Sequence, residues 1–257
     1  MSKTVNWIFV AVMISLVLAD QWKDISVWIY VTWCIAYVAV LAYGSSVLSA
    51  GYFVPVLWRG AEASGAVALT FDDGPVAGRT DKILDILSQH QAPAAFFCIG
   101  KRVEAHPQLV HRMHHAGHLV ANHSYFHRVT FDLQSSSSIG AELRTTDLAI
   151  ERAIGNMPVY FRPPFGVTNP MVGAAVRKGK YTTIGWSIRS LDTVINDRAR
   201  LLRRITSSLK GGDIILLHDH GPCTVDILSD LLKQISALGL KIVRVDELLN
   251  EKAYVQA

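Results

Sequence analysis

The sequence has 257 residues, half of them hydrophobic and 18% of them charged, and its formal net charge is only +4. The chain is richer in apolar residues than an average soluble domain. Its basic residues form no tract and no helical stripe, so the composition argues against a nucleic-acid-binding protein. Its three cysteines are scattered, which excludes a disulfide framework and a cysteine zinc site.

Two uncharged segments begin the chain. Residues 25–58 hold no charged side chain, which suffices for one membrane span of roughly 20 residues and a short interfacial piece. Residues 5–19 are also uncharged but short for a span, and they match the apolar core of a signal peptide. Three arrangements stay open: a helical hairpin that turns at residues 20–24, a cleaved signal peptide, and an uncleaved peripheral segment. The long second segment predicts membrane attachment, and residues 1–60 are expected to form the anchor.

The side of the membrane on which the remaining chain lies stays open at this point. With two spans, Lys3 and Arg59 both flank the pair, and the positive-inside rule then favours the cytoplasmic side. With a single span and the N-terminus inside, the remaining chain would lie outside.

Residues 61–257 form a second unit, in which short apolar runs alternate with segments of helical spacing. This alternation predicts a parallel sheet covered by helices, and seven repeats fit a small or incomplete β/α barrel. An open doubly wound sheet is the alternative. The seven expected strands are residues 67–71, 94–100, 118–122, 159–162, 182–188, 213–218 and 240–245.

Charged or metal-capable side chains follow five of the seven expected strands. In a β/α barrel the carboxyl ends of the strands converge on one face, where active sites lie. The segments are TFDDGP, NHSYFH, FRPPFG, WSIRSLD and LLHDH. The sequence therefore predicts one site built from five strand ends.

Two pairs of residues indicate the chemistry of this site. Asp72 and Asp73 leave the first strand at an Asp-Gly turn and would point in different directions, so that one can ligate a metal while the other accepts a proton. His123 and His127 are four residues apart, and on a helical turn their imidazoles would share one face. A metal ion held by one carboxylate and two imidazoles keeps a coordination position open for water, and the ion activates that water.

Two further segments supply candidates for the rest of the chemistry. Arg162 precedes Pro163 and Pro164, which lack an N–H, so the first free backbone donor after this strand is Phe165. That N–H could contact a carbonyl oxygen that gains negative charge. His218, which follows an apolar strand, is the candidate general acid.

TFDDGP (70–75), HSYFH (123–127), RPPFG (162–166) and LLHD (216–219), in this order, resemble the signature motifs of the polysaccharide deacetylases, carbohydrate esterase family 4, also called the NodB homology domain. The resemblance covers roughly residues 66–250. It implies a distorted seven-stranded β/α barrel and metal-dependent hydrolysis of N-acetyl groups on sugars.

The resemblance also implies roles for individual residues. Asp73, His123 and His127 would hold one divalent transition metal ion, with zinc as the leading candidate, and Asp72 would be the general base. The remaining roles concern the bound substrate and the groups that orient the catalytic residues. Phe165 N–H would contact the oxyanion, His218 would protonate the amine, Arg162 would orient Asp72, and Leu217 would line the acetyl pocket.

The fifth motif departs from the family pattern of an aspartate, two residues and Asp-Trp. Arg189 replaces the first carboxylate, and Thr193 replaces the tryptophan. Asp192 is then the candidate partner that polarises His218, and Trp186 the candidate apolar wall.

The sequence thus predicts a membrane-anchored hydrolase that removes N-acetyl groups from amino sugars of an envelope polysaccharide, peptidoglycan or a lipid-linked glycan. The expected partners are such a glycan and a membrane, and not nucleic acid. An O-acetyl glycan esterase and a catalytically impaired, membrane-tethered glycan-binding module are the alternatives.

Overall fold

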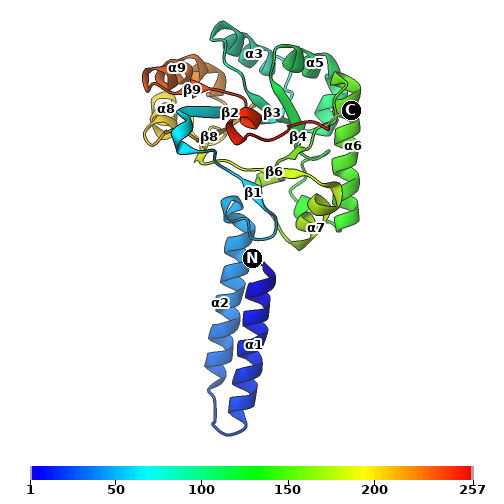
Figure 1. Ribbon diagram of the computed structural model, residues 1–257, viewed down its shortest axis with the longest axis vertical. Coiled ribbons are helices and arrows are strands. Elements are labelled where there is room, and N and C mark those ends of the chain that lie inside the picture. Colours follow the sequence, from blue (N-terminus) through cyan, green and yellow to red (C-terminus); the bar gives the residue numbers. More distant parts are fainter. Residues whose placement is uncertain (1, 256–257) are drawn as a thin grey trace.

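The computed structural model describes residues 2–255 and consists of a helical hairpin that projects from an α/β domain (Figure 1). The hairpin consists of α1 (Ser2–Asp20) and α2 (Val27–Ser46). The two helices contact each other through aromatic side chains: the Phe9 ring stacks on the Tyr37 ring at a centroid distance of 4.0 Å. Among the described helices, α2 alone has the length and apolar composition of a membrane span, and α1 contains a shorter apolar helix over Thr4–Asp20.

The domain is built on a curled parallel sheet. The strands follow the order β1-β6-β5-β4-β3-β2-β8-β7, and β9 pairs with the first two residues of β2. Within residues 2–255 no ladder joins β1 to β7, so the sheet forms an incomplete barrel, and the predicted fold class is confirmed. The strands are β1 (Val56–Leu57), β2 (Ala66–Gly74), β3 (Ala95–Cys98), β4 (Leu119–Asn122), β5 (Tyr160–Phe161), β6 (Thr182–Ile184), β7 (Ile188–Arg189), β8 (Ile214–His218) and β9 (Lys241–Ile242).

Each of the seven expected segments contains a strand, but the segment 182–188 is divided, since β6 ends at Ile184 and β7 begins at Ile188. β1 is an additional strand of two residues. β1 pairs with β6 although its residues fall in the segment that the sequence assigns to the anchor. Arg59 then pairs with Asp213 at 2.7 Å, which ties the chain after β1 to the residue before β8. The sheet therefore includes residues on the N-terminal side of the expected boundary at residue 60.

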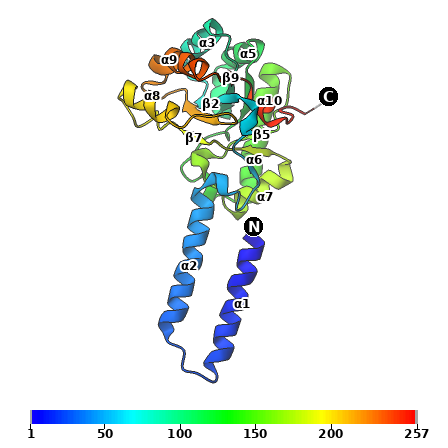
Figure 2. The same cartoon turned by 60° about the vertical axis from the view of Figure 1, so that its left-hand side comes forward.

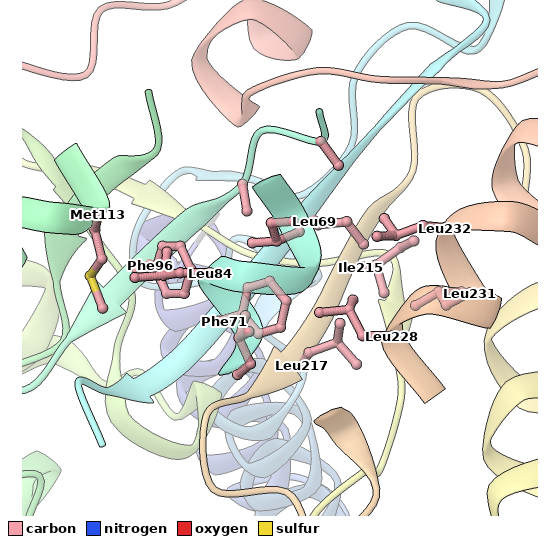
Figure 3. Close-up of a cluster of buried hydrophobic side chains, with 14 of the residues drawn as sticks. Leu69, Phe71, Leu84, Phe96, Met113, Ile215, Leu217, Leu228, Leu231 and Leu232 are labelled. Carbon is pink, nitrogen blue, oxygen red and sulfur yellow. The ribbon is translucent and has the colours of Figure 1, made fainter. Parts of the chain in front are cut away.

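Helices cover the outer face of the sheet (Figures 1 and 2). Leu84 of α3, Met113 of α5 and Leu228 of α9 belong to one buried cluster with side chains of β2, β3 and β8 (Figure 3). The domain helices are α3 (Thr80–Gln89), α4 (Gly100–Ala105), α5 (Pro107–His115), α6 (Ser136–Ile154), α7 (Pro170–Gly179), α8 (Arg198–Thr206), α9 (Thr224–Ala237) and α10 (Val245–Leu249). Short 3₁₀ turns are η1 (Leu48–Ala50), η2 (Glu62–Ser64), η3 (Phe131–Leu133) and η4 (Pro164–Gly166).

The alternation of side chains along β2 decides which carboxylate faces the inside of the curled sheet. Leu69 and Phe71 belong to the cluster beneath the outer helices, whereas Ala68 belongs to the cluster of the inner face. Because successive strand residues point to opposite faces, Thr70 and Asp72 continue the inner row. Asp72 is therefore directed into the barrel at the carboxyl end of β2.

Candidate functional site

The carboxyl ends of the strands enclose a cavity of about 230 Å³. The polar residues expected at strand ends meet here, although they are far apart in the sequence. Because all the strands are parallel, their carboxyl ends lie at one edge and their side chains can converge. The lining residues are Asp72, Asp73, His123, His127, Phe165, Gly166, Trp186, Arg189, Leu191, Thr193, Val194, Leu216, His218 and His220.

Asp73, His123 and His127 form a compact group with one candidate ligand atom from each, all within 4.8 Å of one another. Asp73 Oδ1 lies 3.5 Å from His123 Nε2 and 3.3 Å from His127 Nε2. Donor atoms about 2.1 Å from a common tetrahedral centre would be about 3.4 Å apart. The spacing of these atoms therefore fits a bound divalent cation.

The hydrogen bonding of this group also fits a metal. Asp73 Oδ1 is buried and has no hydrogen-bond partner among the described residues, so it is available as a ligand. His123 Nδ1 lies 2.8 Å from the Arg162 carbonyl oxygen, which fixes the ring and leaves Nε2 unprotonated in the neutral tautomer. The three residues thus offer one carboxylate oxygen and two imidazole nitrogens to one point.

The protonation states agree with this arrangement. Burial opposes ionisation of Asp73, but His123 and His127 outweigh it and hold the pKa of this carboxyl well below its usual range. Burial, together with the nearby His123, lowers the pKa of His127 to about 4. At neutral pH the aspartate is charged and His127 is neutral, as metal coordination requires.

The prediction that His123 and His127 lie on a helical turn is wrong, because residues 123–127 form an irregular loop after β4. Ser124 and His127 have positive φ angles of 63° and 52°, and this left-handed geometry folds the loop back on itself. Ser124 Oγ accepts a hydrogen bond of 3.1 Å from the His127 N–H. The two rings nevertheless come together, with centroids 4.8 Å apart.

Asp72 is held by Arg162, as the resemblance implies. Arg162 is fully buried, and its Nη1 donates to Asp72 Oδ1 at 2.7 Å. The same nitrogen donates to Thr70 Oγ1, while Nε and Nη2 donate to the carbonyl oxygens of Ile184 and Gly185. The second oxygen of Asp72, Oδ2, lies 3.7 Å from His123 Nε2 and so faces the metal group.

His218 lies across the cavity, with Asp192 against its ring. Asp192 Oδ1 is 2.7 Å from His218 Nδ1, and Asp192 Oδ2 accepts the His218 N–H at 2.7 Å. Ser190 and Thr224 also donate to Asp192, which is fully buried. Burial alone would lower the pKa of His218, but the bond to Asp192 and the neighbouring carboxylates raise it above its usual value.

Apolar side chains close the cavity, and one of them differs from the prediction. Phe165 and Trp186 both line it, as expected, and Trp186 lies against Gly166 so closely that a Cβ there would be 2.4 Å from its ring. The prediction for Leu217 is wrong. Leu216 lines the cavity, whereas Leu217 packs in the outer core (Figure 3), because neighbouring strand residues face opposite sides.

Phe165 itself has a positive φ of 58°. The hydrogen bonds of its turn are donated by the N–H groups of Gly166 and Val167 to Pro163 and Pro164. The Phe165 N–H is therefore outside the hydrogen bonds of the turn, as the two prolines suggested.

Several residues of the site were not singled out from the sequence. His220 Nδ1 lies 3.4 Å from Asp73 Oδ2, and Arg102 donates to the Asp73 carbonyl oxygen. Asp219 is fully buried beneath Gly74 and accepts a hydrogen bond from Thr80. Burial raises the pKa of Asp219 to about 7. The HDH segment was a signal for His220, whereas nothing local in the sequence marks Arg102.

A larger cavity, of about 590 Å³, lies between α6 and α7, and Asp147 and Tyr181 line it. These two side chains are hydrogen-bonded to each other, and the Asp-His-His group is not among the lining residues. The smaller cavity at the strand ends is therefore the candidate active site.

Comparisons with known proteins agree with this assignment. The family model "Polysaccharide deacetylase" matches residues 59–184. A peptidoglycan-N-acetylglucosamine deacetylase of Bacillus cereus is 33% identical over 205 residues, which cover 77% of this chain and 94% of that protein. The peptidoglycan-N-acetylglucosamine deacetylase PgdA of Listeria monocytogenes is 31% identical over 195 residues, but the match covers 76% of this chain and only 41% of PgdA.

The fold comparison gives the same relationship. The crystal structure of the Bc1960 peptidoglycan N-acetylglucosamine deacetylase superposes with a TM-score of 0.72 and 27% sequence identity. The superposition covers 77% of this chain and 94% of that structure. The match leaves about a quarter of this chain outside the superposition.

Proposed function

We propose that this chain, which belongs to the polysaccharide deacetylase family, is a membrane-anchored, metal-dependent hydrolase that removes N-acetyl groups from amino sugars of an envelope glycan. The observation that carries the proposal is the unpartnered Asp73 Oδ1 between two imidazole nitrogens, with Asp72 and His218 on the same cavity. The peptidoglycan deacetylases among its relatives support amide-linked acetyl groups as the substrate chemistry.

Asp73, His123 and His127 would hold the ion, and zinc suits one carboxylate and two imidazoles. A divalent ion held there would supply a Lewis acid that makes water more acidic and polarises the amide carbonyl. The side chains of the protein transfer the protons. Asp72 accepts the proton of the attacking water through the oxygen that Arg162 leaves free.

His218 completes the hydrolysis. Its Nδ1 is bonded to Asp192, so Nε2 is the nitrogen that can face the substrate. As the carbonyl carbon gains the water oxygen, the C–N bond breaks, and His218 gives its proton to the departing nitrogen. The products are acetate and a free amine. The Phe165 N–H would stabilise the negative charge on the carbonyl oxygen, and such a donor is worth roughly 3 kcal/mol.

The hairpin is the proposed membrane anchor, and the domain from about residue 48 onward is the proposed catalytic unit. α1 has 19 residues and α2 has 20, so each is close to 30 Å long, about the thickness of the hydrocarbon core. Only 6% of the apolar window of α2 is buried, which is unlike a core helix. Large apolar side chains face outward: Trp7, Ile14, Val17, Trp28, Ile35 and Val38.

If both helices span, the first described turn of α1 and the catalytic domain lie on the same side, because both are at the same end of the hairpin (Figures 1 and 2). A reporter fused to the C-terminus identifies that side.

The test uses the full-length protein, reconstituted with zinc, and a chito-oligosaccharide of N-acetylglucosamine. We expect equimolar acetate and free amine from the native protein. Asp72→Asn should retain its metal and lose activity by about 10²–10⁴-fold, since general-base catalysis contributes that factor. Release of acetate with a free hydroxyl from an O-acetylated glycan only would favour an esterase. Saturable binding without acetate release would favour a binding module and refute the proposal.

A further inference from the structure

Next to the active site lies a groove of about 520 Å³ that has four arginines in its wall. They are Arg189 of β7 and Arg200, Arg203 and Arg204 of α8. All four side chains are exposed, and none lies within ion-pair distance of a carboxylate among residues 2–255. The expectation that the chain has no basic helical stripe is therefore wrong for α8.

The arrangement of α8 explains how so many cations come together. Leu201 and Ile205 are fully buried and fix one face of the helix against the core. The opposite face of α8, toward β7, then carries Arg200, Arg203 and Arg204. Arg204 Nε donates to the Arg189 carbonyl oxygen at 3.0 Å, which joins the helix to the strand. Unpaired guanidinium groups repel one another, so their convergence favours an anionic ligand, above all a phosphate that accepts paired hydrogen bonds.

The groove and the active site share one residue. Arg189 lines both, and it is the residue that replaces the first carboxylate of the fifth family motif. A substrate with its acetyl group beside Asp72 could therefore have an anionic group near Arg189 and continue along α8. A neutral glycan would use none of these charges.

The active site also lies close to the end of the proposed membrane span. Ser45, at the end of α2, accepts a hydrogen bond of 3.0 Å from the Thr168 N–H, and its hydroxyl donates to the Thr168 carbonyl. Thr168 is three residues after Phe165, whose ring is 4.7 Å from that of His127. Three residues span at most about 11 Å. Figures 1 and 2 show the hairpin meeting the domain on the side of α7.

Exposed apolar side chains occur in residues 129–133 and in the lining of the active-site cavity. Val129 and Leu133 are 79% and 78% exposed, and Phe165 and Val194, which line the cavity, are 52% and 70% exposed. Asn169 donates to the Asp132 carbonyl, so the loop of Leu133 is joined to the segment after Thr168. Exposed apolar groups that adjoin a membrane anchor favour contact with the bilayer.

From these features we propose that the substrate is an N-acetylated amino sugar joined through phosphate to a membrane lipid, and that the arginine groove binds the phosphate. The apolar loops rest on the bilayer, the lipid stays in the membrane, and the sugar enters the cavity with its phosphate near Arg189. The proposal rests on the deacetylase function and specifies its substrate class.

The experiment compares three substrates with the full-length protein in phosphatidylcholine vesicles. The first is N-acetylglucosamine linked through phosphate to a polyprenyl chain in the same vesicles, the second is soluble N-acetylglucosamine 1-phosphate, and the third is neutral tri-N-acetylchitotriose. We expect kcat/KM to fall in this order. Equal values for the first two substrates would overturn the lipid component of the proposal. Equal values for all three would overturn the proposal completely.

Variants separate the groove from the catalytic residues. Arg200→Ala/Arg203→Ala should raise KM for the phosphorylated lipid about twofold to twenty-fivefold at low salt, because each exposed ion pair contributes a factor of about 1.5 to 5. High salt should reduce this difference. Hydrolysis of chitotriose should not change. Arg198→Ala is the matched control, since Arg198 lies on the same helix, pairs with Asp226 at 2.8 Å and is outside the groove.

A second pair of variants tests the apolar loops. Val129→Glu/Leu133→Glu should lower kcat/KM severalfold for the vesicle substrate and leave chitotriose unaffected, whereas Leu238→Glu, at the end of α9, should change neither. An unchanged KM in the arginine variant would overturn the phosphate site. If no substrate releases acetate, the proposed function itself fails. In that case, binding of the protein to soluble N-acetylglucosamine 1-phosphate, with and without Arg200 and Arg203, still decides whether the groove is an anion site.

Discussion

Replacement of Arg162 by methionine gives a direct measure of how the buried carboxylate is held. Arg162 and Asp72 are 0% and 3% exposed, and their side chains are 2.7 Å apart. Methionine keeps an unbranched apolar stem in this space, where the guanidinium carbon lies 4.0 Å from the centroid of the Phe97 ring, but it is shorter than arginine. The substitution therefore removes the charge and the hydrogen bonds of the guanidinium group, and it also leaves the space of that group unfilled.

The expected cost follows from the charge that is left behind. Removal of one partner of a buried ion pair destabilises a protein by about 3–5 kcal/mol. Since 1 kcal/mol changes the Tm of a domain of this size by about 2–4 °C, Arg162→Met should lower Tm by roughly 6–20 °C. The measurement is thermal unfolding followed by tryptophan fluorescence, in the presence of a chelator, because a bound cation would also compensate Asp72.

Two comparisons separate this cause from others. Arg152→Met removes an exposed arginine that pairs with Glu104 at 2.9 Å, and it should cost less than about 1 kcal/mol. Asp72→Asn/Arg162→Met should be more stable than Arg162→Met alone, because asparagine carries no charge. A fall in Tm below about 3 °C for Arg162→Met, or a double variant as unstable as the single one, would refute the reasoning.

Two further predictions concern the metal group and the acid. His127→Ala should weaken zinc binding by more than about tenfold, measured by metal analysis after dialysis. His115→Ala, a change at an exposed histidine outside the group, should not weaken it. Equal metal content in both variants would contradict the ligand assignment. Asp192→Asn removes the contact that raises the pKa of His218, so the proton that His218 must donate is lost at lower pH. The alkaline limb of the kcat profile should then move to lower pH, and an unchanged limb would exclude His218 as the acid.

The position of the active site could be predicted because the strands are parallel. Once the order of strands and helices is recognised, all carboxyl ends fall on one edge, and polar residues after separate strands must converge. The order of strands and helices alone therefore predicts that Asp72, Asp73, His123 and His218 lie at one site. The departure of the fifth motif predicts Asp192 as the partner of His218, and in the structure Asp192 makes two hydrogen bonds to His218.

Other features had no local signal in the sequence. β8 is an apolar run buried on both faces, so it lacks the alternation that would tell whether Leu216 or Leu217 faces the cavity. β1 and β7 have two residues each, too few for any period. The groove of α8 differs, because Arg200, Arg203 and Arg204 lie in one short segment, residues 198–204, which is a local signal for a basic helix. Only the fold adds Arg189 of β7 to them.

The loops of the active site show why spacing alone did not give the geometry of the ligands. Asp73, Ser124, His127, Phe165 and Leu191 all have positive φ, although none is glycine. Each such residue costs about 1–3 kcal/mol and persists only when its surroundings fix it. Arg102 holds the carbonyl of Asp73, and Asn122 Oδ1 accepts the Ser124 N–H at 2.9 Å. These left-handed residues lie at or beside one cavity, and neighbouring groups fix them. The rest of the fold therefore compensates an unfavourable backbone geometry that positions these side chains. That cost is expected where the geometry serves binding and catalysis.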